Sequence, residues 1–159
     1  MIAVGDVAPD FEGITHENRR FRLSEARGKR PVVIFFYPGD FTPVCTTEAC
    51  GFRAMREELS GLSFDLIGVS TDSLETHRRF AESYHLEFPL IEDDGQKIAA
   101  LFGATNLVCC ALKRAKRVTV VIDAEGRIAE IVRAELSARV HVDAARMALQ
   151  RLSPVQNHA

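Results

Sequence analysis

The feature that most constrains this chain is an uninterrupted apolar run, Val32 to Phe36. Because apolar and polar residues do not alternate, the run predicts a strand buried on both faces, in the middle of a parallel or mixed sheet. A turn at 38–40 ends the strand, and residues 45 to 59 have the composition of a helix. Cys45 would lie in the first turn of that helix, where unpaired backbone N–H groups and the helix dipole stabilise a thiolate over a thiol. We therefore expect chemistry at this sulfur.

The rest of the chain alternates strands with helices. We expect a hairpin over 11–23, strands over 64–70, 117–123 and 127–133, a short segment over 88–91, and helices over 74–84, 96–102 and 137–152. The core side of the last helix is expected to consist of Val140, Ala144, Met147, Ala148 and Leu152. This order predicts an α/β protein with a central mixed β-sheet flanked by helices and an N-terminal β-hairpin. A thioredoxin-like fold fits best, because its reactive cysteine begins the helix after a central strand.

Composition and charge narrow the possible functions. A length of 159 residues predicts one domain over 1–159, and the net charge of −2 gives no reason to expect a nucleic-acid partner. The sequence shows neither a signal peptide nor an apolar stretch long enough for a membrane. Four cysteines without a signal peptide fit a reducing compartment, and we expect the cytoplasm. Their spacing lacks the CxxC pairs typical of a zinc site.

The stretch from Pro38 to Cys45, PGDFTPVC, resembles the signature of the peroxiredoxins, which has the form Pro-x-x-x-Thr/Ser-x-x-Cys. The longer string DFTPVCTTEACGFR is similar to the Q-type subgroup, also called bacterioferritin comigratory proteins, in which a second cysteine follows five positions later. That cysteine is Cys50. The likeness extends from VGDVAPDF near the start to RVTVVIDAEGRI. Two departures are visible: Val44 stands where the subgroup usually has glycine, and Cys109-Cys110 is outside the pattern.

The resemblance implies a thiol peroxidase with no metal, haem or flavin cofactor. Cys45 would attack the peroxide, and Thr42 would place its hydroxyl beside the sulfur, donating to the thiolate and contacting the incoming peroxide. Arg117, at the start of a strand, matches the family arginine that holds the thiolate with a planar fork of donors. Each residue has a plainer alternative: a small buried side chain for Cys45, helix capping for Thr42, and a solvated cation for Arg117.

Three further positions complete the expected site. Pro38 would shield the sulfur from water, or would only end the strand. Glu48 would orient the arginine, or would only favour the helix N-terminus. The backbone N–H groups of Val44 and Cys45 would bind the peroxide as in an oxyanion hole, and the Val44 side chain would add bulk at the pocket mouth.

The same resemblance implies that Cys50 resolves the sulfenic acid of Cys45 as a disulfide. On an intact helix, positions five apart are separated by about 7.5 Å of rise and point in different directions. A disulfide tolerates a Cα separation of at most ~7 Å, so the helix must unwind, and Gly51 would ease this change. Cys50 packing in the core is the alternative, and Cys109 or Cys110 is another candidate resolving thiol.

The expected function is therefore reduction of hydrogen peroxide and small organic hydroperoxides, with thioredoxin or a similar dithiol protein as the reductant. The protein would act as a monomer or homodimer. One alternative is a redox sensor or holdase that uses the same cysteine to switch a binding surface. A thioredoxin-type disulfide reductase is a further alternative, although the usual Cys-x-x-Cys motif is absent.

Overall fold

The computed structural model of the chain describes residues 2–105 and 114–153, and its centre is a five-stranded mixed sheet of order β5-β4-β3-β6-β7. The central strand β3 runs parallel to β4 and antiparallel to β6, β5 extends the parallel side, and β7 extends the antiparallel side. A separate antiparallel hairpin, β1 with β2, precedes the sheet. The bounds are β1 Glu12–Ile14, β2 Arg20–Arg22, β3 Val32–Phe36, β4 Asp65–Ser70, β5 Leu90–Glu92, β6 Val118–Ile122 and β7 Ile128–Arg133.

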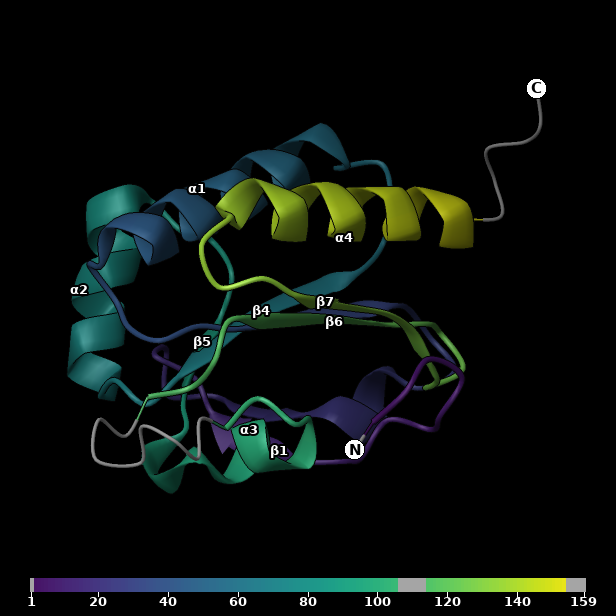
Figure 1. The fold of residues 1–159 in the computed structure, drawn as a ribbon, viewed down its shortest axis with the longest axis horizontal. Helices are drawn as coiled ribbons and strands as arrows, with labels where there is room; N and C mark the ends of the chain where they lie inside the picture. Colours follow the sequence, from purple (N-terminus) through teal and green to yellow (C-terminus); the bar gives the residue numbers. More distant parts are fainter. Residues whose placement is uncertain (1, 106–113, 154–159) are drawn as a thin grey trace.

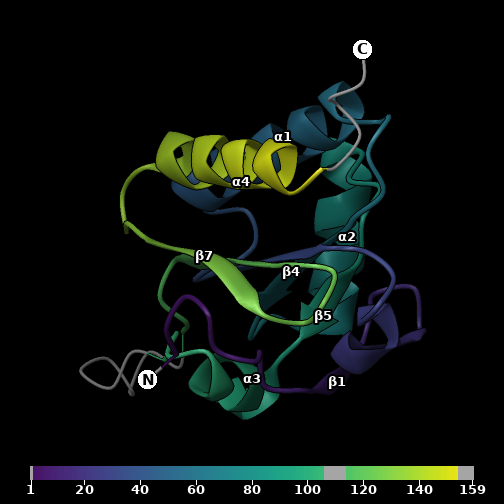
Figure 2. The ribbon, with the colours of Figure 1, turned by 90° about the vertical axis from the view of Figure 1, so that its right-hand side faces the viewer.

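Helices cover both faces of the sheet (Figure 1). They are α1 (Pro43–Glu58), α2 (Leu74–Tyr84), α3 (Lys97–Leu101) and α4 (Ala138–Leu152), with 3-10 turns at Leu23–Ala26 and Asp94–Gln96. Helices α1 and α4 lie side by side over one face, α3 and the N-terminal hairpin lie at the other, and α2 packs against β5 (Figure 2). The predicted thioredoxin-like architecture and its N-terminal hairpin are therefore confirmed.

The apolar run in β3 is buried because both of its faces are covered. All five residues are at most 1% exposed. Val33 and Phe35 point toward α1 and α4, where Phe35 stacks on Phe52 with ring centroids 4.5 Å apart. The alternate residues Val32, Ile34 and Phe36 belong to the second core, with Phe11 and Phe102. A strand between two cores has no polar side, which is why the sequence shows no alternation.

The predicted core side of α4 is wrong in part. Val140 is 47% exposed and Met147 is 62% exposed, whereas only Ala148 of the expected residues is fully buried. The side that packs on the sheet consists of Ala138, His141, Val142, Ala145, Ala148 and Leu149. The helix is rotated from the expected orientation because His141 is turned inward, where both of its ring nitrogens have hydrogen-bonding partners. A prediction based on apolar residues alone counts histidine as polar and places it outside.

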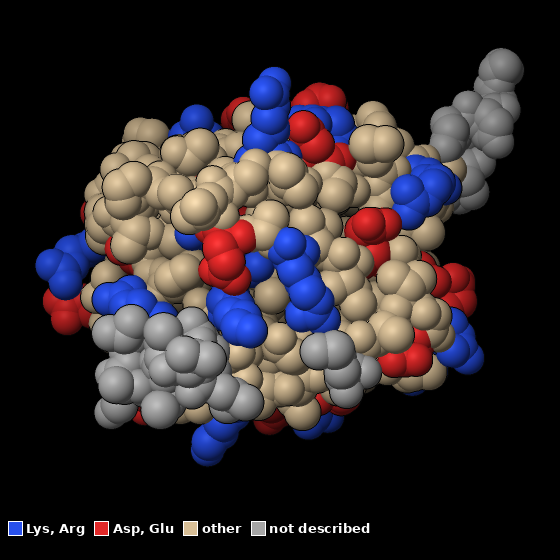
Figure 3. All heavy atoms as spheres, in the orientation of Figure 1, with Lys and Arg blue, Asp and Glu red and all other residues tan. Residues whose placement is uncertain are grey.

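The outer surface carries both signs of charge. On the face viewed in Figure 3, Lys and Arg side chains are interspersed with Asp and Glu side chains. Across residues 2–105 and 114–153, no helix combines the length and the apolar character needed to cross a bilayer.

We expect Gly68→Ala to destabilise the fold by about 1–3 kcal/mol, the usual cost of overpacking a core. Gly68 lies in the buried strand β4, and a Cβ there would come within 2.8 Å of Leu90 and 2.9 Å of Phe35. Urea unfolding of the two proteins measures the difference. Gly61→Ala is the matched control, because nothing lies within 4 Å of its Cβ position. Equal stability of Gly68→Ala and the wild type would contradict the packing described here.

Candidate active site

The sheet register brings together two segments that are far apart in the sequence. In the antiparallel pair of β3 and β6, Phe36 lies opposite Val118. The residue before β6, Arg117, therefore lies beside the loop that follows β3 and leads into α1. Strand β3 ends and strand β6 begins at the same edge of the sheet. Helix α1 starts over this edge. The candidate active site forms where the two segments meet.

The loop between β3 and α1 is held by hydrogen bonds to neighbouring elements. The Tyr37 hydroxyl donates to Asp40 Oδ1 at 2.6 Å, and the Asp40 backbone N–H donates to Asp72 Oδ2 at 2.8 Å. Arg114 donates from Nη1 to the Pro38 carbonyl at 2.9 Å. Pro38 itself is half-buried. These bonds fix the backbone that precedes Cys45.

Thr42 is the N-cap residue of α1, but its hydroxyl does not cap the helix. It donates instead to the Gly39 carbonyl at 2.9 Å. The expected donation to the Cys45 thiolate is therefore wrong, because a hydroxyl has a single hydrogen to donate. A side chain on Gly39 would meet the guanidinium of Arg114, which would have to move from its place at the Pro38 carbonyl. Pro43 occupies the first helical position, and the N–H groups of Val44 and Cys45 follow within the first turn, where no intrahelical acceptor is available. The Val44 side chain is half-buried.

Cys45 is 1% exposed, and its sulfur contacts Arg117. Arg117 Nη2 donates to Sγ at 3.3 Å, Nη1 donates to Glu48 Oε1 at 2.7 Å, and Nε donates to the backbone carbonyl of Glu135 at 2.9 Å. The guanidinium is therefore held on all of its sides, and Arg117 is only 4% exposed. The alternative of a solvated cation is wrong for this residue. A fixed, buried guanidinium at this distance is a donor placed for negative charge on the sulfur.

Glu48 lies one turn after Cys45 and is completely buried. Burial raises the pKa of its carboxyl to about 7, while the charge and hydrogen bond of Arg117 act in the opposite direction. Only Oε1 is bonded to the arginine. Oε2 is buried without a hydrogen-bond partner and lies 3.7 Å from Nδ1 of His141.

His141 is a residue of this cluster that the sequence interpretation missed. It is completely buried on α4, with Nε2 2.7 Å from the Ala134 carbonyl and Nδ1 2.8 Å from the Thr119 hydroxyl. A signal was present, because Ala138, Val142, Ala145 and Leu149 form a second apolar stripe along the same helix. His141 falls within that stripe at helical spacing.

The two cysteines of α1 are both free thiols, and Cys50 is partly buried. The helix is continuous from Pro43 to Glu58, so it separates them by five positions. Gly51 lies where α4 approaches closely, since a Cβ there would come within 2.9 Å of Val142. Cys109 and Cys110, the other candidate resolving thiols, lie outside the described residues.

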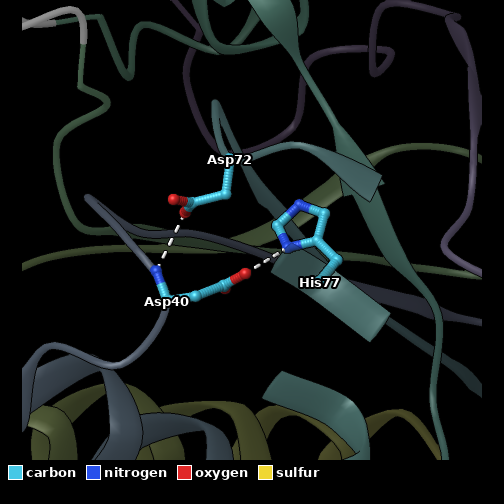
Figure 4. A group of neighbouring side chains, drawn as sticks. All are labelled: Asp40, Asp72 and His77. Atoms are coloured by element: carbon cyan, nitrogen blue, oxygen red, sulfur yellow. Dashed lines mark hydrogen bonds and ion pairs between the residues drawn. The ribbon is translucent and has the colours of Figure 1, made fainter. Parts of the chain in front are cut away.

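A second buried polar cluster, Asp40, Asp72 and His77, has the composition of a metal site (Figure 4). His77 Nδ1 lies 2.6 Å from Asp40 Oδ2, and Nε2 lies 3.1 Å from the Ile91 carbonyl. A carbonyl only accepts, so Nε2 carries a hydrogen and has no lone pair for a metal. Asp72 Oδ2 already accepts from the Asp40 N–H and the Ser70 hydroxyl. We interpret this cluster as support for the loop before Cys45.

The raised pKa of Glu48 gives a test based on stability. A carboxyl whose pKa rises from 4.5 unfolded to about 7 folded binds more protons in the folded state over that range. The contribution of Glu48 to the free energy of unfolding is therefore full below pH ~4.5 and is lost as the pH rises through ~7, by about 3 kcal/mol at most. We expect Glu48→Gln to remove this decline, measured by urea unfolding across the range.

Glu58→Gln is the matched control for that measurement. Glu58 ends the same helix, but its side chain is 52% exposed and pairs with Arg146. We expect this variant to keep the pH dependence of the wild type. Parallel curves for Glu48→Gln and the wild type would contradict a carboxyl that is protonated by burial.

Comparison with known proteins identifies the family of the chain. The model of the AhpC/TSA family matches residues 4–131. Peroxiredoxin Bcp of Bacillus subtilis is 39% identical over 155 residues, which cover 96% of this chain and 98% of that protein. Chloroplastic peroxiredoxin Q of Sedum lineare is 34% identical over 151 residues, which cover 95% of this chain and 80% of that protein.

Solved structures are similar over nearly the whole chain. The crystal structure of peroxidoxin BcpB from Mycobacterium tuberculosis matches with a TM-score of 0.88 and 34% identity, covering 96% of this chain and 99% of that one. A bacterioferritin comigratory protein of Xanthomonas campestris, described for its alkyl peroxide reduction activity, matches with a TM-score of 0.81 and 26% identity, covering 95% and 97%. The chain therefore belongs to the AhpC/TSA family and is a peroxiredoxin, an enzyme of the thiol peroxidase class.

Proposed function

We propose that Cys45 is the thiolate that reduces hydrogen peroxide and small organic hydroperoxides in this enzyme. The observation that carries the proposal is the 3.3 Å contact between Arg117 Nη2 and the Cys45 sulfur, with Nη1 of the same guanidinium fixed on Glu48. Because the guanidinium of Arg117 is already held in place by both contacts, it does not have to move when negative charge develops in the transition state. The alkyl peroxide reduction named for the Xanthomonas relative supports the substrate class.

The reaction moves negative charge along the S–O–O line. The Cys45 thiolate attacks one peroxide oxygen, the S–O bond forms as the O–O bond breaks, and the other oxygen leaves as hydroxide or alkoxide and takes up a proton. Sulfur is oxidised to the sulfenic acid and the peroxide is reduced. Arg117 and the N–H groups of Val44 and Cys45 are the donors for this charge.

Thr42 acts as the acceptor for the peroxide hydrogen. Its own hydrogen is directed to the Gly39 carbonyl, so the lone pairs of its oxygen remain available. Pro38 and the Val44 side chain are both half-buried and would form the wall that limits water at the sulfur. Glu48 would orient the arginine rather than touch the substrate.

Cys50 is the proposed resolving thiol. Its attack on the sulfenic acid gives a Cys45–Cys50 disulfide and releases water, so the first turns of α1 must unwind. Thioredoxin or a similar dithiol protein would then reduce the disulfide in the cytoplasm, where a reducing environment keeps both cysteines as thiols between turnovers.

The proposal predicts that Cys45→Ser abolishes peroxide consumption with a dithiol reductant. We expect Arg117→Lys to lower kcat/KM for hydrogen peroxide about 10²–10³-fold, because lysine keeps the charge but cannot contact sulfur and carboxylate together. Arg133→Lys is the matched control, because the side chain of this exposed arginine, within residues 2–105 and 114–153, donates only to the Gly103 carbonyl. Wild-type turnover by Cys45→Ser would overturn the proposal.

The resolving step predicts a specific change on oxidation. After one equivalent of peroxide, peptide mass spectrometry should detect a Cys45–Cys50 linkage, and circular dichroism should show a loss of helix. Cys50→Ser is the control, in which the helix content should stay unchanged. A linkage from Cys45 to Cys109 or Cys110, or no linkage at all, would contradict resolution by Cys50.

A further inference from the structure

A buried histidine lies behind the site, outside the steps proposed above. His141 Nε2 lies 2.7 Å from the Ala134 carbonyl, so this nitrogen carries a hydrogen and donates it. The ring is thereby fixed with Nδ1 directed toward Thr119 Oγ1, at 2.8 Å, and toward Glu48 Oε2, at 3.7 Å. The threonine hydroxyl donates to Nδ1 when this nitrogen is bare and accepts from it when it is protonated.

The Glu48 oxygen that faces this ring lacks a donor. Among the described residues, Glu48 Oε2 and Gln96 Oε1 are the buried side-chain oxygens without a hydrogen-bond partner. A buried carboxylate oxygen without a hydrogen-bond donor lowers the stability of the folded protein. An unprotonated Nδ1 cannot act as that donor, because it presents a lone pair rather than a hydrogen. One proton changes this arrangement. On Oε2 it removes the charge of the carboxylate, and on Nδ1 it is donated to Thr119 Oγ1 and places a positive charge 3.7 Å from Oε2.

The charges of the cluster show when that proton is needed. With Cys45 as a thiolate, the Arg117 cation faces two anions, the thiolate and Glu48. A proton on the Glu48–His141 pair makes the buried group neutral. With Cys45 as a thiol, Arg117 and Glu48 already balance. Glu135 is the other nearby acid, but it is exposed to water and contacts the backbone N–H of Arg117.

We propose that Glu48 and His141 together hold one proton whenever Cys45 is ionised, and that His141 is thereby a positioning residue that keeps Arg117 directed at a thiolate. This inference rests on Cys45 being the reactive thiol. Burial acts on the two partners in opposite directions, raising the pKa of Glu48 to about 7 and lowering the pKa of His141 below its ordinary 6.5. A buried pair in contact titrates as a unit, so the proton belongs to the pair.

The test is the pH dependence of Cys45 alkylation by iodoacetamide, followed on its peptide by mass spectrometry in a Cys50→Ser background. We expect His141→Asn to move the pH midpoint upward by roughly one unit, the shift that a nearby charge produces. Glu48→Gln should move it downward, because the second anion is gone. In the Glu48→Gln background, His141→Asn should then have no effect on the midpoint.

His16→Asn is the matched control, because His16 is also buried but accepts a hydrogen bond from the Leu90 N–H of the edge strand β5 and contacts neither Glu48 nor Arg117 among the described residues. It should leave the midpoint unchanged. An unchanged midpoint in His141→Asn overturns the proposal, and so does an equal shift in both Glu48 backgrounds. These measurements use no peroxide, so their failure is distinct from a failure of the proposed peroxidase function.

A second measurement keeps the proposal testable if His141→Asn does not fold. NMR of the His141 ring and of the Glu48 carboxyl follows the protonation of both partners in the wild type and in Cys45→Ser. We expect the pair to lose its shared proton at lower pH in Cys45→Ser, because the thiolate that requires the proton is absent. Identical titration in the two proteins would overturn the proposal.

Discussion

The fork of Arg117 is the interaction on which the candidate site depends. One guanidinium donates to the sulfur of Cys45, to the carboxyl of Glu48 and to the backbone of Glu135, and it is almost completely buried. A cation taken out of water in this way is tolerable only while its partners stay in place, since a buried charge without a partner is strongly destabilising. The arrangement that stabilises a thiolate is therefore also part of what holds α1 on the sheet.

The sheet explains how this fork reaches a cysteine 72 positions away in the sequence. The loop before Cys45 follows β3 at one edge of the sheet. Antiparallel β6 begins at that same edge, with Phe36 opposite Val118, so Arg117 lies beside the loop. The loop is fixed in turn by Asp40, whose carboxylate joins Tyr37 and His77. Backbone pairing sets the approach of the two segments, and buried polar contacts set the final orientation of the side chains.

Local signals in the sequence were sufficient for the fold and for part of the site. The apolar run of β3 and the turn after it predicted the strand and the helix that bears Cys45, and the motif resemblance selected Arg117. The apolar stripe that contains His141 could have indicated the buried side of α4, whereas the partners of its ring, Thr119 and Ala134, lie on other elements and could not be predicted from this helix. The predicted face of α4 was rotated because the other apolar stripe was chosen.

The contacts of α1 indicate which of its turns would loosen first in the proposed resolving step. Its later turns are tied by Arg53 to the Tyr84 carbonyl and by Glu58 to Arg146, whereas its first turns depend on the contact between Glu48 and Arg117. When peroxide converts the thiolate to a sulfenic acid, the sulfur loses its charge, and the arginine loses one of its two anionic partners. The contact of Arg117 with residue 45 weakens at the step after which Cys50 must approach, while the contacts of Arg53 and Glu58 do not involve the sulfur. In the proposed mechanism, oxidation of the sulfur would itself loosen the first turn of the segment that has to unwind.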